Sequence, residues 1–164
     1  IFYTSLFTYG AAAVEIVLGL GKWEGRAGQR LTRDTIFPVC TPALARRIHD
    51  VNDLLQQNLF GLPGTLQTWD NWLSSHIGHR KYARPRIHHV STWALSMQWA
   101  LEGLGVALAH DTVANDLIAS GRLVRLLEHA LPMKEAYYLI SPEGSLINPA
   151  AKAFKGWLMQ EIKG

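Results

Sequence analysis

The sequence predicts an α/β fold, because segments typical of strands alternate with segments typical of helices along most of its 164 residues. One clear example is the apolar run VALA at 106–109, which precedes the helix signal of Asp111 and a helical stretch at 112–120. The hydrophobic content of 48% is sufficient for one domain or two small lobes. We therefore expect largely parallel sheets, with a ligand site near helix N-termini at the carboxyl ends of strands.

The expected strands are rich in β-branched and aromatic residues or are short apolar runs between turn residues. Residues 22–29 (KWEGRAGQ) are expected to form a loop, and 56–67 either a loop or a short strand. The expected strands are 1–9, 14–20, 36–40, 84–91, 106–109 and 136–140.

The expected helices begin at capping residues. Thr41, followed by Pro42, opens a helix that includes 44–55; Ser91 and Thr92 open 93–102; Asp111 opens the next helix. Gly103 and Gly121 end the last two of these helices. Two further helices are expected at 68–79, with Trp69, Trp72 and Leu73 on one face, and from Asn148 and Pro149 onward, with Phe154, Trp157, Leu158 and Ile162 on one face.

Composition limits the function classes. The net charge is +3, but Lys and Arg are scattered, which gives little support for direct contact with nucleic acid. The apolar window 11–21 is interrupted by Glu15 and is shorter than the roughly 20 residues of a membrane span. No basic segment typical of a signal peptide precedes it, and without an initiator Met the chain is expected to be a fragment. The single cysteine, Cys40, is expected to be a buried thiol in a reducing compartment.

Catalytic and metal motifs are incomplete. The stretch GLGK at 19–22 lacks the first glycine and the final Ser or Thr of a phosphate-binding P-loop. The histidines at 76, 79, 88 and 89 lack the companions of a recognised zinc pattern, and no serine or cysteine has the surroundings of a nucleophile. We expect no enzyme activity, catalytic residue, metal or cofactor.

Several motifs, in order, resemble a known family. They are FPVCTPALA, W..WL, ALSMQWALEGLGVAL, DLIASGRLVRL, YYLISPEG and NPAAKAFKGWLMQE. From Val14 onward the chain is similar to the effector-binding domain of LysR-type transcriptional regulators, in particular the subgroup that includes the glycine-cleavage activator. His110 departs from the family pattern, which usually has Pro after the GLGVAL strand.

The resemblance implies a fold like that of periplasmic binding proteins, with two α/β lobes joined by two crossing strands, near 33–37 and 135–138. One lobe is then 36–135 and the other is 1–35 with 136–164. The second is too small for the family, so we expect either truncation or a gap near 10–13 where the family has a helix. The family's DNA-reading helix-turn-helix is also missing from this chain, and a cytoplasmic location is expected.

The resemblance also implies an effector site in the cleft between the lobes. Ser91 and Thr92 are expected to hold a small anion with their hydroxyls and with the free N–H groups of the following helix, in addition to capping that helix. Gly19, Leu20 and Gly21 match the cleft-lining segment of the first lobe, although a simple glycine turn is the alternative. Thr8 is expected to face the cleft, and Trp93 and Trp23 either to close over the ligand or to pack in the core.

The expected function is that of a sensor, in which a small anionic effector shifts the population of two arrangements and so controls a DNA-bound oligomer. The alternative is a periplasmic-type solute-binding domain or an enzyme on the same scaffold. Effector domains are expected to pair side by side through the helices at 150–162 and 44–55, giving a dimer and, in the full-length protein, a tetramer.

Overall fold

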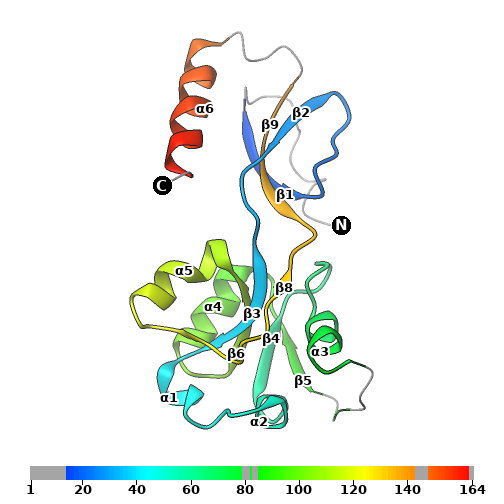
Figure 1. Ribbon diagram of the computed structural model, residues 1–164, viewed down its shortest axis with the longest axis vertical. Coiled ribbons are helices and arrows are strands. Elements are labelled where there is room, and N and C mark those ends of the chain that lie inside the picture. The colour runs from blue at the N-terminus through cyan, green and yellow to red at the C-terminus, as the bar shows by residue number, and fades with distance from the viewer. Residues whose placement is uncertain (1–13, 79–81, 83–84, 143–147, 163–164) are drawn as a thin grey trace. The chain divides into compact units, whose positions relative to one another are not determined.

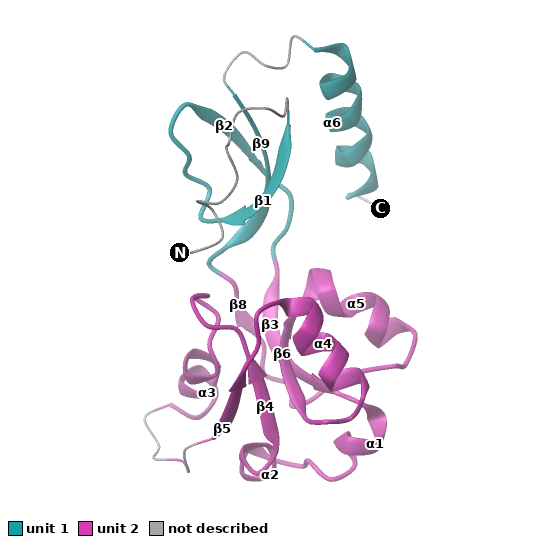
Figure 2. Cartoon of the chain, turned by 180° about the vertical axis from the view of Figure 1, so that it is seen from behind, with its two compact units in different colours: residues 1–33, 134–164 teal, residues 34–133 magenta. Residues whose placement is uncertain are grey.

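The computed structural model describes residues 14–78, 82, 85–142 and 148–162. The chain forms two compact units, one of residues 1–33 with 134–164 and one of residues 34–133 (Figure 2). We call these unit 1 and unit 2. The strand expected at 1–9, including Thr8, lies outside the described residues.

Unit 1 contains a three-stranded antiparallel sheet in the order β1-β9-β2. Strand β1 is Glu15–Gly19, β2 is Arg26–Arg30 and β9 is Ala136–Pro142. The loop expected at 22–29 is therefore wrong in its second half. The β2 sequence, RAGQR, has no β-branched or aromatic residue, so its strand conformation comes from pairing with β9 and not from local propensity.

Helix α6 of unit 1 spans Pro149–Glu161, and the Asn148 side chain accepts a hydrogen bond from the Ala150 N–H at 2.9 Å. This confirms the expected start. Phe154, Trp157 and Ile162 are exposed at 38%, 54% and 40%, so this face of the helix is largely uncovered within the described residues.

Unit 2 contains a mixed sheet in the order β5-β4-β6-β3-β7, with β8 also paired to β3. Its strands are β3 Thr35–Cys40, β4 Asn58–Gly61, β5 Arg86–His89, β6 Val106–His110, β7 Val124–Arg125 and β8 Leu131–Pro132. Strand β4 is parallel to β5 and β6, whereas β3 is antiparallel to β6, β7 and β8. The expectation of largely parallel sheets is therefore wrong, because periodicity identifies a strand but not its direction.

The helices of unit 2 are α1 Pro42–Ala45, α2 Val51–Leu55, α3 Trp69–Ile77, α4 Trp93–Leu101 and α5 Asp111–Ala119. The helix expected over 44–55 is two short helices, because the Asp50 side chain accepts a hydrogen bond from the Asp53 N–H and starts α2 anew. Asp111 is the first residue of α5 and not its cap, which is His110. The caps at Thr41 and Thr92, and the ends at Gly103 and Gly121 with positive φ, are confirmed.

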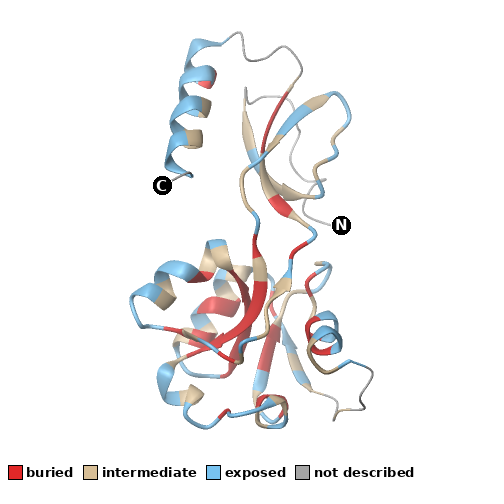
Figure 3. Cartoon of the chain, in the orientation of Figure 1, coloured by how far each residue is buried: buried red, intermediate tan, exposed pale blue. Residues whose placement is uncertain are grey.

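The core of unit 2 lies on both sides of its sheet (Figure 3). Helices α4 and α5 supply Met97, Ala100 and Ala114 to a cluster with Phe37 and Val39 of β3 and small residues of β6. Trp69 and Trp72 of α3 are also buried, as their spacing predicts, and Trp69 donates its indole N–H to the Phe60 carbonyl at 2.9 Å. The small residues of β6 let α4 approach the sheet closely.

Candidate functional site

One edge of the unit 2 sheet gathers the carboxyl ends of its parallel strands. Strands β4, β5 and β6 end there, and α4 and α5 begin there (Figure 1). Because Ile36 of the antiparallel β3 pairs with His110, the start of β3 lies at the same edge. In α/β sheets, this is the edge at which small ligands bind.

The N-terminus of α4 presents hydroxyls and backbone N–H groups at this edge. The Thr92 Oγ1 accepts the Leu95 N–H at 3.1 Å, and the first helical bond runs from the Ser96 N–H to the Thr92 carbonyl. The N–H groups of Trp93 and Ala94 thus have no partner within the helix. Ser91 is exposed and precedes the cap instead of forming it. This end of α4 has the chemistry of an anion site.

Trp93 is half-buried and lies against His110, with ring centroids 5.1 Å apart and ring planes at 87°. His110 is fully buried, and its Nδ1 is 3.2 Å from Asp34 Oδ2. Burial lowers the pKa of His110, although the Asp34 and Asp111 carboxylates act in the opposite direction. Trp93 therefore packs at the candidate site and also contacts a buried polar pair.

Asp111 holds the start of β3 instead of capping α5. Its Oδ2 accepts hydrogen bonds from the Thr35 backbone N–H at 2.6 Å and from the Thr35 hydroxyl at 2.8 Å. Its Oδ1 accepts a third from Arg125 at 2.6 Å. The acidic residue that suggests a helix cap in the sequence is thus used to bind another strand, which no local pattern could indicate.

The segment Gly19–Gly21 begins at the last residue of β1 in unit 1. Gly21 has φ of +84°, so the glycine turn is present, and a side chain there would meet the Tyr138 hydroxyl. Trp23 packs over Gly19 and Gly28 and contacts Tyr138 edge-to-face at 5.2 Å, while Leu20 is 60% exposed. That this segment faces Ser91 and Thr92 stays a prediction.

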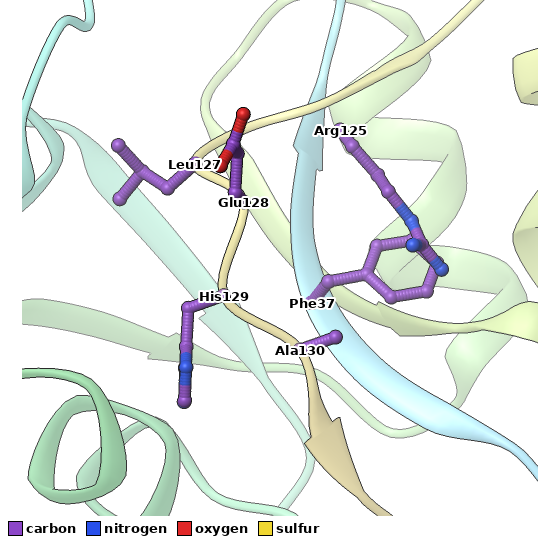
Figure 4. Close-up of a pocket in the computed structure, with 6 residues that line it drawn as sticks. All are labelled: Phe37, Arg125, Leu127, Glu128, His129 and Ala130. Carbon is purple, nitrogen blue, oxygen red and sulfur yellow. The ribbon is translucent and has the colours of Figure 1, made fainter.

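A pocket of about 390 Å³ lies beside β3 in unit 2, lined by Phe37, Arg125, Leu127, Glu128, His129 and Ala130 (Figure 4). Arg125 covers the Phe37 ring, with its guanidinium carbon 3.4 Å from the ring centre. Leu127 has φ of +59°, a conformation that favours glycine. The sequence does not indicate this pocket. The positive φ of Leu127 cannot be predicted from the sequence, because leucine rarely adopts this conformation.

The histidines that raise the question of a metal are spread over unit 2. His76 stacks on Trp72 and lies 5.0 Å from the His129 ring, while Ser75 Oγ and His129 Nε2 are hydrogen-bonded at 2.7 Å. His88 and His89 are on β5, and His79 lies outside the described residues. Within the described ranges, no three His, Cys, Asp or Glu side chains are grouped so as to hold a metal ion.

In the part of the chain that the structure describes, no helix has the length and apolar character needed to cross a membrane. Cys40 is buried, as expected, and desolvation raises the pKa of its thiol to about 12.

Comparison with known proteins gives a consistent result. Residues 12–163 match the family description "LysR substrate binding domain". The chain is 28% identical over 150 residues to the glycine cleavage system transcriptional activator of Escherichia coli K12, covering 89% of this chain and 48% of that protein. It is 25% identical over 145 residues to the transcriptional activator AmpR of Enterobacter cloacae, covering 88% and 49%. The chain thus spans about half the length of these relatives, which are transcriptional regulators and not enzymes.

Solved structures share the fold. The effector domain of AmpR from Pseudomonas aeruginosa matches with a TM-score of 0.79 at 24% identity, covering 92% of this chain and 72% of that one. The AmpR effector-binding domain from Citrobacter freundii matches with a TM-score of 0.80 at 22% identity, covering 92% and 74%. With the family match over nearly its whole length, the chain belongs to the LysR substrate-binding domain family.

Proposed function

We propose that this domain senses a small anionic metabolite for a cytoplasmic LysR-type transcriptional regulator. The observation that carries the proposal is the N-terminus of α4, where the Thr92 cap, the exposed Ser91 and two N–H groups without helical partners lie together. The positive end of the helix dipole adds to the attraction for an anion. A carboxylate suits this arrangement because it accepts several hydrogen bonds at once.

In this proposal, Trp93 covers the apolar part of the effector. An effector that binds one arrangement of the protein more tightly than another shifts their populations by that difference in affinity. Through an N-terminal helix-turn-helix outside this chain, the shift would change how a DNA-bound oligomer acts. The family match and the regulator relatives support this reading over a solute-binding or enzymatic role.

The anion site is tested by isothermal titration calorimetry, which measures the affinity of the full chain for succinate, citrate, glycine and alanine as separate probes. We expect at least one of them to bind, and the variants Ser91→Ala and Thr92→Val to weaken that binding about tenfold or more, since a hydrogen bond to a charged group contributes roughly 1.5–3 kcal/mol.

Thr68→Val is the matched control. Thr68 caps α3 by accepting the Asn71 N–H at 3.2 Å, as Thr92 caps α4, so its loss has a comparable effect on stability. We expect the Thr68→Val variant to bind like the unmodified chain. Equal affinity for the Thr92→Val variant, or no binding of any probe, would contradict the anion site.

We also propose that the domain self-associates through α6. Phe154 and Trp157 of this helix and Ile162 at its C-cap are exposed apolar residues. The second surface suggested by the sequence, around 44–55, offers less, because Leu54 and Leu55 of α2 are buried in unit 2.

A further inference from the structure

His110 links three parts of unit 2 that are far apart in the sequence. It ends β6 and caps α5, its ring packs against Trp93 at the start of α4, and its Nδ1 meets the Asp34 carboxylate. Its side chain is 0% exposed and that of Asp34 is 5% exposed. Buried polar groups of this kind rigidify their surroundings when they are hydrogen-bonded.

Asp34 is the point at which the chain enters unit 2, and Met133 is the point at which it leaves. The Met133 N–H donates to the Asp34 carbonyl at 2.9 Å, so the residues at which the chain enters and leaves unit 2 are hydrogen-bonded to each other. We call this pair of residues, Asp34 and Met133, the passage. The Asp34 carboxylate also accepts the Thr112 hydroxyl at 2.8–2.9 Å. The next residue, Thr35, is bound by Asp111, so the passage is fixed to the start of α5 at two successive positions.

The contact with Asp34 favours one tautomer of His110. A carboxylate oxygen accepts hydrogen bonds, so a neutral His110 with its proton on Nδ1 donates a hydrogen bond to Asp34. The proline that the family resemblance implies at position 110 has no side-chain donor and no aromatic ring. It would therefore make neither the bond to Asp34 nor the ring contact with Trp93.

We propose that His110 is a positioning residue that holds Trp93 against the Asp34 passage, and that a second proton on its buried ring destabilises unit 2 while the Nδ1–H bond to Asp34 stays in place. A second proton places a cation in a fully buried position. Among the described residues, the carboxylates that act on the His110 ring are Asp34, just before β3, and Asp111 of α5, and Arg125 of β7 forms an ion pair with Asp111. Burial outweighs these carboxylates, since the pKa of His110 lies below its ordinary value of 6.5.

The consequence for function is that acidification lowers the stability of the region that holds Trp93 and the passage. The effect on effector sensing rests on the proposed function, because Trp93 is a proposed effector contact. The link between His110, Asp34 and Trp93 does not, and it can be measured without any ligand.

The test uses ¹⁵N nuclear magnetic resonance and thermal unfolding of the full chain between pH 7.5 and 5. We expect the Nδ1–H tautomer of His110 at pH 7.5, and the Trp93 indole resonance to shift at the same midpoint as the His110 ring. The His110→Asn variant retains a donor to Asp34 but cannot titrate, so it should lose the Trp93 shift. Between pH 7.5 and pH 5, the Tm of the unmodified chain should fall, and the Tm of the His110→Asn variant should fall by about 2–4 °C less.

The direction in which stability changes with pH follows from the number of protons bound by the folded and unfolded states. A histidine with a lowered pKa in the folded state binds fewer protons than in the unfolded state, so the stability is complete at neutral pH and falls as pH drops below 6.5. His89→Asn, at an exposed position on β5, is the matched control and should follow the unmodified chain. In the His110→Pro variant, the Met133 N–H should exchange with solvent faster at both ends of the pH range.

An Nε2–H tautomer, or the same pH-dependent loss of Tm in the His110→Asn variant and the unmodified chain, would overturn the proposal. If His110→Pro does not fold, the His110→Asn measurements decide the question. Failure of every anion to bind would count against the proposed effector site and would leave these measurements unaffected.

Discussion

Cys40 shows how burial at the residue scale controls reactivity. It lies in the interior of unit 2 at the end of β3, and its thiol donates to the Thr41 carbonyl at 3.3 Å. Because the thiolate is the reactive form, a pKa raised from 9.0 to about 12 makes the thiolate fraction about a thousandfold smaller at neutral pH. We therefore expect the Cys40 thiol to be unreactive in the folded chain.

We expect the native chain to react at pH 8 with a disulfide reagent at least about a thousandfold more slowly than the chain unfolded in guanidinium, which should release one equivalent of thiol. With one cysteine in the chain, the reading is unambiguous, and Cys40→Ser supplies the blank. Rapid reaction of the folded chain would show that Cys40 is accessible.

At the scale of elements, glycines decide how closely two segments approach. A Cβ at Gly105, just before β6, would collide with the backbone carbonyl of Asn58, which cannot move aside like a flexible side chain. Gly156, within α6, has open space around it. The same substitution is therefore expected to have opposite effects at these two positions.

Gly105→Ala should lower the free energy of unfolding by roughly 1–3 kcal/mol, the usual cost of overpacking. Gly156→Ala should raise it by about 0.5–1 kcal/mol, because alanine favours the helix. Chemical denaturation of both variants measures this. A Gly105→Ala variant as stable as the unmodified chain would mean that β4 and β6 separate easily.

The sequence correctly predicted the features that depend only on neighbouring residues, such as the helix caps. Thr41, Thr92 and Asn148 all cap helices as predicted, because a cap needs only the residues of one turn. Strand β2 and the direction of β3 were missed because both depend on pairing with distant segments. At the site, Thr92 was found for the same local reason, whereas His110, Asp34 and the pocket beside Phe37 arise only from tertiary contacts.

At the scale of the whole molecule, the chain divides into two units that differ in how fully their large apolar side chains are buried. The sheet of unit 2 is packed by helices, and its buried residues include Phe37, Trp69 and Trp72. In unit 1, by contrast, α6 keeps Phe154 and Trp157 exposed among the described residues. The assignment of these units as the two lobes of a binding protein stays a prediction.

The exposed face of α6 leads to the last prediction, that the chain self-associates. A two-fold pair uses the same patch on both copies and should bury at least about 1,000 Å² in total. We expect light scattering to show a dimer whose population rises with concentration, and Trp157→Glu to shift it to a monomer, because a charge at the centre of an apolar interface is costly. Lys152→Glu, at an exposed position on the same helix, is the matched control and should leave the dimer intact. A strict monomer at high concentration would show that α6 does not pair with itself.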